Sequence, residues 1–122
     1  MITGSCLCGA VTITVPALPP ELKSCNCSAC RRYGALWAYY PRDQVTLSGE
    51  TTGFERSDMG EPAMIAFHHC PTCHCFTHWQ DVRPEPESRM GINARLMPPE
   101  CVAGLRIRRF DGADTWTDLD DD

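Results

Sequence analysis

Short alternations of apolar and polar residues recur along the chain, and no longer periodic pattern joins them. In residues 10–15, AVTITV, the apolar side chains of Val11, Ile13 and Val15 alternate with threonines, a two-residue period typical of a half-buried strand. Aromatic or β-branched content between turn residues predicts further short strands. These segments are 35–40, 44–47, 63–67, 76–79, 91–96 and 105–110. The strands at 63–67 and 76–79 flank the sequence HHCPTC and are predicted to form a hairpin around it.

Helical periodicity is absent from every window long enough to form an amphipathic helix. Ten prolines and nine glycines interrupt the chain every few residues. The most helix that the sequence predicts is a single turn around residues 28–33. We therefore expect a mostly β fold of short antiparallel strands with little helix, whose small core would gain stability from a bound metal.

A chain of 122 residues is long enough for one hydrophobic core and too short for two ordinary domains. We expect residues 1–122 to form a single zinc domain. Its last segment, 114–122, contains five aspartates and no basic residue, which predicts a solvated acidic tail that can be disordered.

The charge balance narrows the range of partners. The net charge is −5 at pH 7 and Lys23 is the only lysine, which argues against non-specific nucleic-acid binding. No apolar run approaches the length needed to cross a bilayer. The N-terminal sequence MITGSCLCGA lacks the basic start and apolar stretch of a secretory signal. The sequence thus predicts a cytoplasmic protein with neither nucleic-acid nor membrane partners.

Nine cysteines are far more than a chain of this length normally carries. Disulfides would require an oxidising compartment and usually an even number of cysteines, and Cys-x-Cys neighbours pair with each other only under strain. Metal binding instead predicts tight local clusters. Three are present: the N-terminal pair Cys6 and Cys8, the triplet Cys25, Cys27 and Cys30, and the knuckle Cys70-Pro-Thr-Cys73. We therefore expect zinc.

The clusters can be combined in more than one way. The N-terminal pair and the knuckle together supply the four sulfurs of a closed structural zinc site. The triplet would then hold a second zinc, with one position left for water or a substrate thiol, which is the pattern of a catalytic site. Spacing alone also allows the triplet to join the knuckle in one site, or a histidine to close the second site.

Side chains near the triplet are candidates for substrate binding. Arg31 and Arg32 follow it directly and could offset the negative charge of three thiolates on one zinc ion, or bind a carboxylate of the substrate. Trp37, Tyr39 and Tyr40 come next and are interpreted as core residues, one of whose rings could form a wall of a pocket.

Other metal-binding side chains crowd the knuckle. They are His68, His69, His74, His78 and Cys75. We interpret the histidines as surface or strand residues, although one of them could reach the open zinc as a base or fourth ligand. Cys75 is interpreted as a packed thiol beside the closed site, and the isolated Cys101 as buried and inert.

Taken together, these motifs resemble the glutathione-dependent formaldehyde-activating enzyme family, which also includes centromere protein V. The likeness extends over nearly the whole chain. It rests on GSCLCGAV at 4–11, CNCSACRR at 25–32 and CPTC at 70–73, with further matches at 45–49, 91–96 and 110–116. One departure is that many members carry glycine directly after the knuckle, where this chain has His74 and then Cys75.

The resemblance implies a β-rich, tent-like zinc fold and two zinc ions per chain, the second of which can be partly occupied. It implies a structural zinc on Cys6, Cys8, Cys70 and Cys73 and a catalytic zinc on Cys25, Cys27 and Cys30. The implied activity is that of an S-(hydroxymethyl)glutathione synthase, a carbon–sulfur lyase that adds glutathione to formaldehyde. The alternative is a non-enzymatic zinc-binding interaction module of the same fold.

Overall fold

Short strands make up most of the regular secondary structure of the computed structural model, which describes residues 1–120. The strands are β1 (Ile2–Ser5), β2 (Thr12–Val15), β3 (Leu22–Cys25), β4 (Trp37–Pro41), β5 (Thr46–Ser48), β6 (Thr52–Glu55), β7 (Ile65–His69), β8 (Phe76–Asp81), β9 (Arg89–Asn93) and β10 (Ile107–Phe110). The helical segments are α1 (Cys30–Tyr33), α2 (Pro99–Val102) and the 3-10 turns η1 (Arg42–Gln44) and η2 (Ala94–Leu96). The expected mostly β fold with little helix is confirmed.

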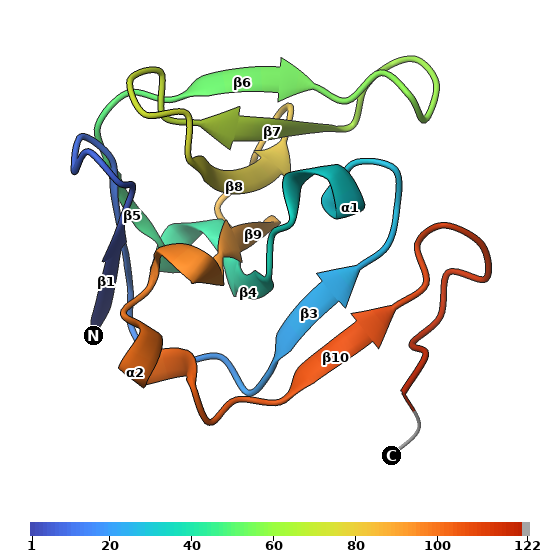
Figure 1. Cartoon of the computed structure of the whole chain (residues 1–122). Helices are drawn as coiled ribbons and strands as arrows, with labels where there is room; N and C mark the ends of the chain where they lie inside the picture. The colour runs from blue at the N-terminus through green and yellow to red at the C-terminus, as the bar shows by residue number, and fades with distance from the viewer. Residues whose placement is uncertain (121–122) are drawn as a thin grey trace.

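Two sheets organise the described strands (Figure 1). One has the order β1-β2-β5, and the other has the order β10-β3-β4-β9-β8-β7-β6. Neighbouring strands pair antiparallel, as expected, except that β10 runs parallel to β3. This exception arises because the chain leaves β9 through η2 and α2 before it returns beside β3, and such a crossover connection permits parallel pairing.

The predicted strands agree with the observed ones in most places and differ in a few. Each of the seven predicted segments overlaps an observed strand, and the expected hairpin around the knuckle is β7–β8. The segment 94–96, expected to continue a strand, is instead the 3-10 turn η2, in which the Asn93 side chain accepts a hydrogen bond from the Arg95 N–H. Strands β1, β3 and β6 were missed because they are short and lack a clean alternation; β6 is exposed throughout.

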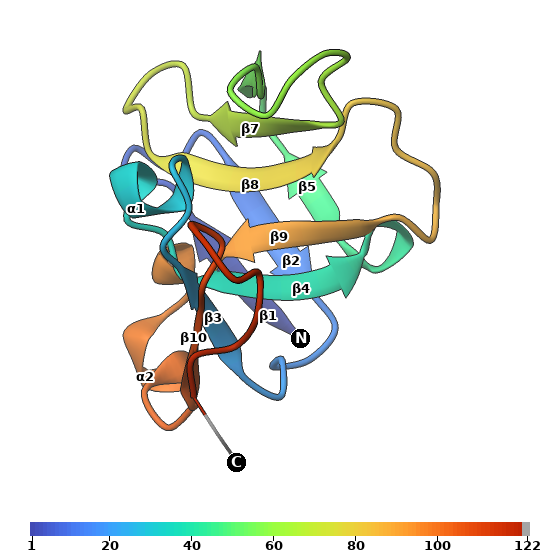
Figure 2. The same cartoon turned by 90° about the vertical axis from the view of Figure 1, so that its right-hand side faces the viewer.

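Alternation along the central strand β4 separates two apolar clusters. Ala38 and Tyr40 face the three-stranded sheet and pack with Ile13 of β2 and Ile92 of β9. Trp37 faces the other way, where the second cluster contains Phe67, Cys27 and Cys30. Figure 2 shows the same division, with β1, β2 and β5 behind β4, β9 and β8, and with α1 and the C-terminal loop in front of them. The front face of the large sheet therefore holds the cysteine triplet.

Gly49 allows a close approach that positions the first cysteine turn. Its φ is +97°, and a Cβ added there would lie 2.0 Å from the Ala10 carbonyl oxygen. We expect Gly49→Ala to lower the free energy of unfolding by at least about 2 kcal/mol, because backbone strain and a backbone clash add together. Gly104→Ala is the matched control, since an added Cβ there meets no atom within 4 Å. Urea unfolding of both variants tests this; equal midpoints would contradict it.

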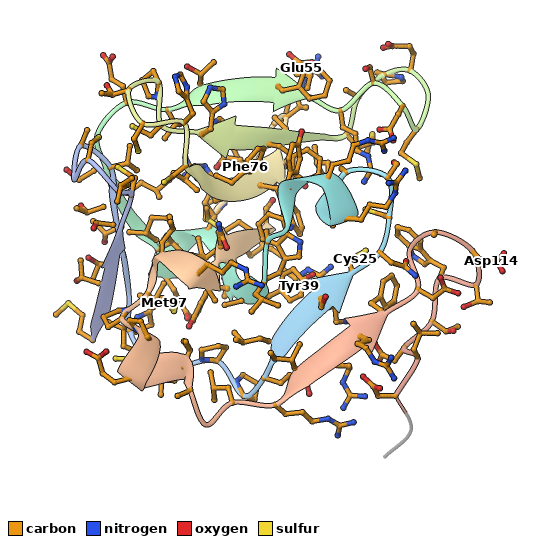
Figure 3. The ribbon with its side chains drawn as sticks, viewed as in Figure 1. Cys25, Tyr39, Glu55, Phe76, Met97 and Asp114 are labelled. Atoms are coloured by element: carbon orange, nitrogen blue, oxygen red, sulfur yellow. The ribbon has the colours of Figure 1, made fainter. Side chains whose placement is uncertain are left out.

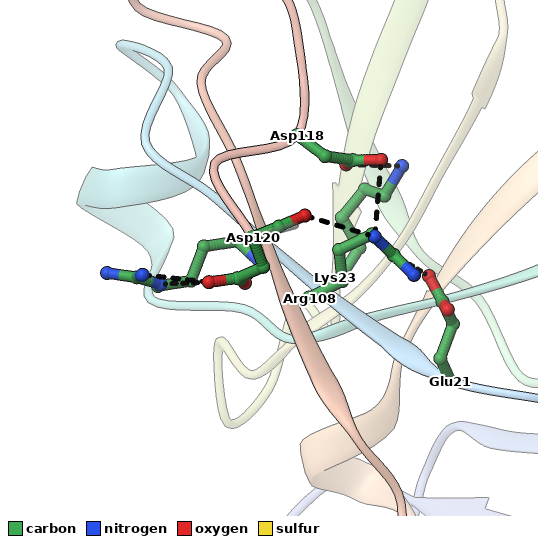
Figure 4. Close-up of polar contacts among 6 residues, drawn as sticks. Glu21, Lys23, Arg108, Asp118 and Asp120 are labelled. Carbon is green, nitrogen blue, oxygen red and sulfur yellow. Dashed lines mark hydrogen bonds and ion pairs between the residues drawn. The ribbon is translucent and has the colours of Figure 1, made fainter. Parts of the chain in front are cut away.

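The C-terminal segment is attached to the sheet by ion pairs (Figure 4). Asp118 lies 3.7 Å from both Lys23 and Arg108, and Asp120 accepts hydrogen bonds from the Arg109 backbone and guanidinium at 2.7–3.0 Å. Arg108 also pairs with Glu21 of the segment before β3. Asp118 and Asp120 of the predicted acidic tail thus contact β3 and β10, whereas residues 121–122 of that tail lie outside the described residues.

Candidate metal centre

The N-terminal pair and the knuckle meet at one end of the molecule. Cys6 and Cys8 lie in the turn between β1 and β2, and Cys70 and Cys73 lie in the turn between β7 and β8. The four sulfur atoms all lie within 4.8 Å of one another, with 3.6 Å between Cys6 and Cys8 and 3.7 Å between Cys8 and Cys70. Sulfurs on a tetrahedral zinc at the usual bond length are roughly 3.8 Å apart. The donor set and its spacing therefore fit a closed zinc site.

Backbone N–H groups around this closed cluster favour thiolates. The N–H of Val11 donates to the Cys6 sulfur at 3.3 Å, and the N–H of Thr72 donates to the Cys70 sulfur at 3.4 Å. Backbone donation from Cys75, followed by that from Cys8, lowers the pKa of the Cys73 thiol to about 5. Thiolates are the form that binds metal, so these backbone donors favour metal binding at Cys6, Cys70 and Cys73.

The cysteine triplet forms a second cluster on the front face. Cys25 ends β3, Cys30 begins α1, and Cys27 lies in the loop between them, with all three sulfurs within 4.8 Å of one another. The Cys27 sulfur accepts from the Cys30 N–H at 3.3 Å, and the Cys30 sulfur accepts from the Trp37 indole N–H at 3.3 Å. Hydrogen bonding from the Cys30 thiol is the main cause that lowers the pKa of Cys25 to about 5.

Within residues 1–120, no histidine or carboxylate joins either cysteine cluster. The rings of His68 and His78 stack on each other with centroids 4.5 Å apart, and His69 lies against His74 at 5.9 Å. Cys75 packs beside the closed cluster, where its sulfur accepts from the Leu7 N–H at 3.4 Å. The triplet thus offers an ion three ligands from the described chain, one fewer than a closed tetrahedral site needs.

Cys101 stands apart from both clusters. It lies on α2 and is half-buried.

A cavity of about 370 Å³ opens at the triplet. Aromatic side chains form much of its wall, and three cations border it. The aromatic residues are Trp37, Tyr39, Phe67, Trp79, Phe110 and Trp116, and the cations are Lys23, Arg56 and Arg89. Figure 3 shows Cys25 at the end of β3, with Tyr39 of β4 and the loop that carries Asp114 on either side of that strand. The site therefore combines soft metal ligands, ring faces and positive charge.

Arg31 and Arg32, the arginines that the sequence suggested as substrate ligands, do not line this cavity. Both are exposed on α1, and Arg32 donates to the Ser28 carbonyl oxygen at 2.8 Å. Their role in substrate binding stays a prediction.

Arg56 is a cation at the site that sequence reasoning missed. It is only 8% exposed, and it donates to Asp58 at 2.8 Å and to the Ser28 hydroxyl at 3.1 Å. Asp58 also accepts a hydrogen bond from that hydroxyl, so one carboxylate holds both groups. Because Arg56 and the triplet are separated by more than twenty residues, no local pattern connects them.

His78 is buried in a way that makes stability depend on pH. It is 1% exposed, its Nδ1 pairs with the Thr77 hydroxyl at 2.9 Å, and its Nε2 has no hydrogen-bond partner within the described residues. Burial, with smaller contributions from His68 and Arg42, lowers its pKa to about 3. The imidazole is therefore neutral in the folded protein at every pH near neutrality.

This burial predicts a loss of stability on mild acidification. The unfolded chain binds a proton at His78 below about pH 6.5 whereas the folded chain does not, so the stabilising contribution is present above that pH and is lost as the pH falls. We expect His78 alone to lower the free energy of unfolding by about 1.4 kcal/mol between pH 7.5 and 5.5. His78→Gln, which cannot titrate, should show a correspondingly smaller decline in urea unfolding. Parallel declines in the two proteins would contradict the prediction.

Comparisons with known proteins identify one sequence family and a similar solved structure. The sequence model of a family described as "glutathione-dependent formaldehyde-activating enzyme" matches residues 1–98. A crystal structure of a Rhodobacter sphaeroides protein is similar, with 26% sequence identity and a TM-score of 0.66, over 86% of this chain and 98% of that chain. No curated protein matches the chain. No helix among the described residues has the length and apolar character that a membrane span requires.

The matched segment 1–98 contains all three cysteine motifs and all the strands next to them. The resemblance expected from these motifs is confirmed. The chain belongs to the glutathione-dependent formaldehyde-activating enzyme family.

Proposed function

We propose that this protein is a zinc-dependent carbon–sulfur lyase that adds a thiol such as glutathione to formaldehyde or a related small aldehyde. The observation that carries the proposal is the cysteine triplet, which offers an ion three sulfurs and borders a cavity large enough for a ligand. The closed cluster, by contrast, has four sulfurs and fits a structural ion. Two zinc ions per chain follow from this division, the second of which can be partly occupied.

Zinc bound to the triplet would supply Lewis acidity that keeps a substrate thiol deprotonated near neutral pH. In the reaction, the thiolate sulfur forms a bond to the carbonyl carbon, and the carbonyl oxygen takes up a proton, so that thiol and aldehyde combine without any loss of atoms. Reversal of these steps releases the aldehyde, which makes the enzyme formally a lyase. The Trp37 indole N–H, which donates to Cys30, holds one of the triplet sulfurs in place.

The residues that line the cavity fit an anionic thiol. The Arg89 guanidinium lies 4.3 Å from the Tyr39 ring centroid and 5.9 Å from that of Trp79, an arrangement that can leave its N–H groups to bind a carboxylate. Lys23 lies 4.9 Å from the Phe110 ring centroid and forms an ion pair with Asp118. We propose these two cations as partners of the glutathione carboxylates. Arg31 and Arg32 would act only on a part of the ligand that extends out of the cavity.

Three broader parts of the proposal rest on the sequence. Residues 1–122 would act as a single domain in the cytoplasm. The acidic balance, with a net charge of −5, supports a small-molecule substrate in preference to nucleic acid.

Metal analysis and thiol titration test the proposed function. We expect about two zinc ions per folded chain, and we expect the cobalt-substituted protein to change its sulfur-to-metal charge-transfer absorption when glutathione is added. Exchange NMR on a mixture of formaldehyde and glutathione should then show faster interconversion of free and hydroxymethylated thiol. A cobalt-substituted protein whose charge-transfer absorption does not change on addition of glutathione would favour the non-enzymatic interaction module instead.

A further inference from the structure

Trp116 has a backbone conformation that its side chain does not explain. Its φ is +60°, a region that bulky residues rarely occupy, and strain of this kind tends to be kept at functional sites. The side chain is 58% exposed although it lines the cavity at the triplet. Its ring system has an aromatic partner, Phe110, in a T-shaped arrangement with centroids 5.3 Å apart. A large aromatic residue is thus held in a strained position where much of its surface remains available to a ligand.

Trp116 belongs to a short loop, residues 111–117, whose two ends are joined by backbone hydrogen bonds. The Trp116 N–H donates to the Asp111 carbonyl oxygen at 2.8 Å, and the Asp111 N–H donates to the Thr117 carbonyl oxygen at 2.8 Å. The Asp111 carboxylate accepts from both the N–H and the hydroxyl of Thr115 at 3.1 and 2.9 Å. These bonds stabilise the loop from within, so the position of the indole is defined by the fold.

The same loop is bonded directly to the cysteine triplet. Asn26, which lies between Cys25 and Cys27, donates from Nδ2 to the Asp111 carboxylate at 3.0 Å and accepts from the Ala113 N–H at 2.9 Å. A Cβ added to Gly112 would lie 2.6 Å from the Cys25 sulfur, so the loop backbone packs directly on a candidate metal ligand. The loop and the triplet therefore hold a fixed position relative to each other.

We infer that Trp116 is a specificity-determining residue of the triplet site, whose indole forms the outer wall against which the body of a sulfur-bound ligand packs. The inference rests on the proposed function and adds to it. The wall selects thiols with a peptide-sized body and has no effect on thiols too short to reach it. Residue 116 lies outside the segment 1–98 that the family model matches, so the match itself assigns no role to this wall.

Thiol affinity in the cobalt-substituted, full-length protein tests the inference. Titrations with glutathione and with 2-mercaptoethanol would be followed by charge-transfer absorption in the wild type, Trp116→Ala and Trp116→Phe. We expect Trp116→Ala to raise the Kd for glutathione about tenfold, the usual size of a lost aromatic contact, and to leave that for 2-mercaptoethanol within about twofold. Trp116→Phe should fall between the wild type and Trp116→Ala.

Leu119→Ala is the matched control, because Leu119 is a similarly exposed apolar residue of the same segment and does not line the cavity. It should bind both thiols as the wild type does. Equal weakening of both thiols by Trp116→Ala would show a merely structural loop, and no change for either would show an idle side chain; both results would overturn the inference and leave the proposed function intact. A wild-type protein that binds neither thiol would overturn both.

Discussion

Cys73→Ser is expected to leave the chain largely unfolded at neutral pH. Cys73 belongs to the closed cluster, which joins the β1–β2 turn to the β7–β8 turn. The apolar contacts around that cluster are few, since the buried residues there are Cys6, Val11 and Cys70. A structural zinc contributes about 10–16 kcal/mol to the folding of small zinc domains, while whole domains are stable by only about 5–15 kcal/mol. Loss of one ligand therefore removes more free energy than the rest of the fold can replace.

Circular dichroism and zinc analysis on the purified variant test this expectation. Cys75→Ser is the control, because it makes the same chemical change two residues away and leaves all four ligands in place. It should keep a native spectrum and an unfolding midpoint close to that of the wild type. A strong chelator added to the wild type should reproduce the loss of structure seen in Cys73→Ser. If Cys73→Ser and Cys75→Ser unfolded at the same urea concentration, the closed cluster would not be the structural site.

Cys27→Ser should give the opposite result, a folded protein without activity. The triplet would then offer an ion two sulfurs in place of three. The fold should survive, because the serine oxygen of the variant can accept the hydrogen bond that the Cys30 N–H donates to the Cys27 sulfur in the wild type. We expect the rate of thiol addition to fall by on the order of 10³-fold or more, since positioning of a reactant alone can supply several orders of magnitude.

Three measurements separate this outcome from general damage. Circular dichroism should show a native fold, metal analysis should find about one zinc fewer per chain, and the cobalt-substituted variant should no longer respond to glutathione. Cys101→Ser is the matched control, because Cys101 lies on α2 and belongs to neither cluster. If Cys27→Ser and Cys73→Ser unfolded alike, the division into structural and catalytic ions would be wrong.

Strands with a regular alternation of apolar residues could be predicted from the sequence, and the fully exposed strand β6 could not. The alternation of Val11, Ile13 and Val15 marks β2 because burial on one face requires apolar residues at every second position. Strand β6 has no such requirement, since each of its residues is exposed and pairing with β7 alone makes it a strand. The parallel pairing of β10 with β3 also leaves no trace in local sequence, because it depends on the path of the chain between them.

The candidate site divides in the same manner. Thiols at metal-ligand spacing mark the N-terminal pair, the triplet and the knuckle, because one ion imposes short distances on its ligands and a tight turn meets them with neighbouring residues. Spacing left open how these groups combine, and the fold brings the N-terminal pair to the knuckle. Arg31 and Arg32 looked suitable by proximity along the chain, whereas Arg56 and Arg89 approach the cavity from other strands and loops. Trp116 was recognised only as part of a family-like motif, without a role. Its position beside the triplet depends on the hydrogen bonds of Asn26 to Asp111 and Ala113, which join segments far apart in the sequence.

The sequence by itself therefore determined that this is a small, mostly β protein with three groups of thiols at metal-ligand spacing. Short-range chemistry carries that information, since strand alternation and ligand spacing act over a few residues. Tertiary structure alone decided which distant aromatic rings and cations surround the triplet, because Arg89 and Trp116 come from segments that sheet pairing and the bonds of Asn26 bring to one cavity. The proposed preference for one ligand over another depends on those rings and cations, so it follows from the tertiary structure and not from local sequence.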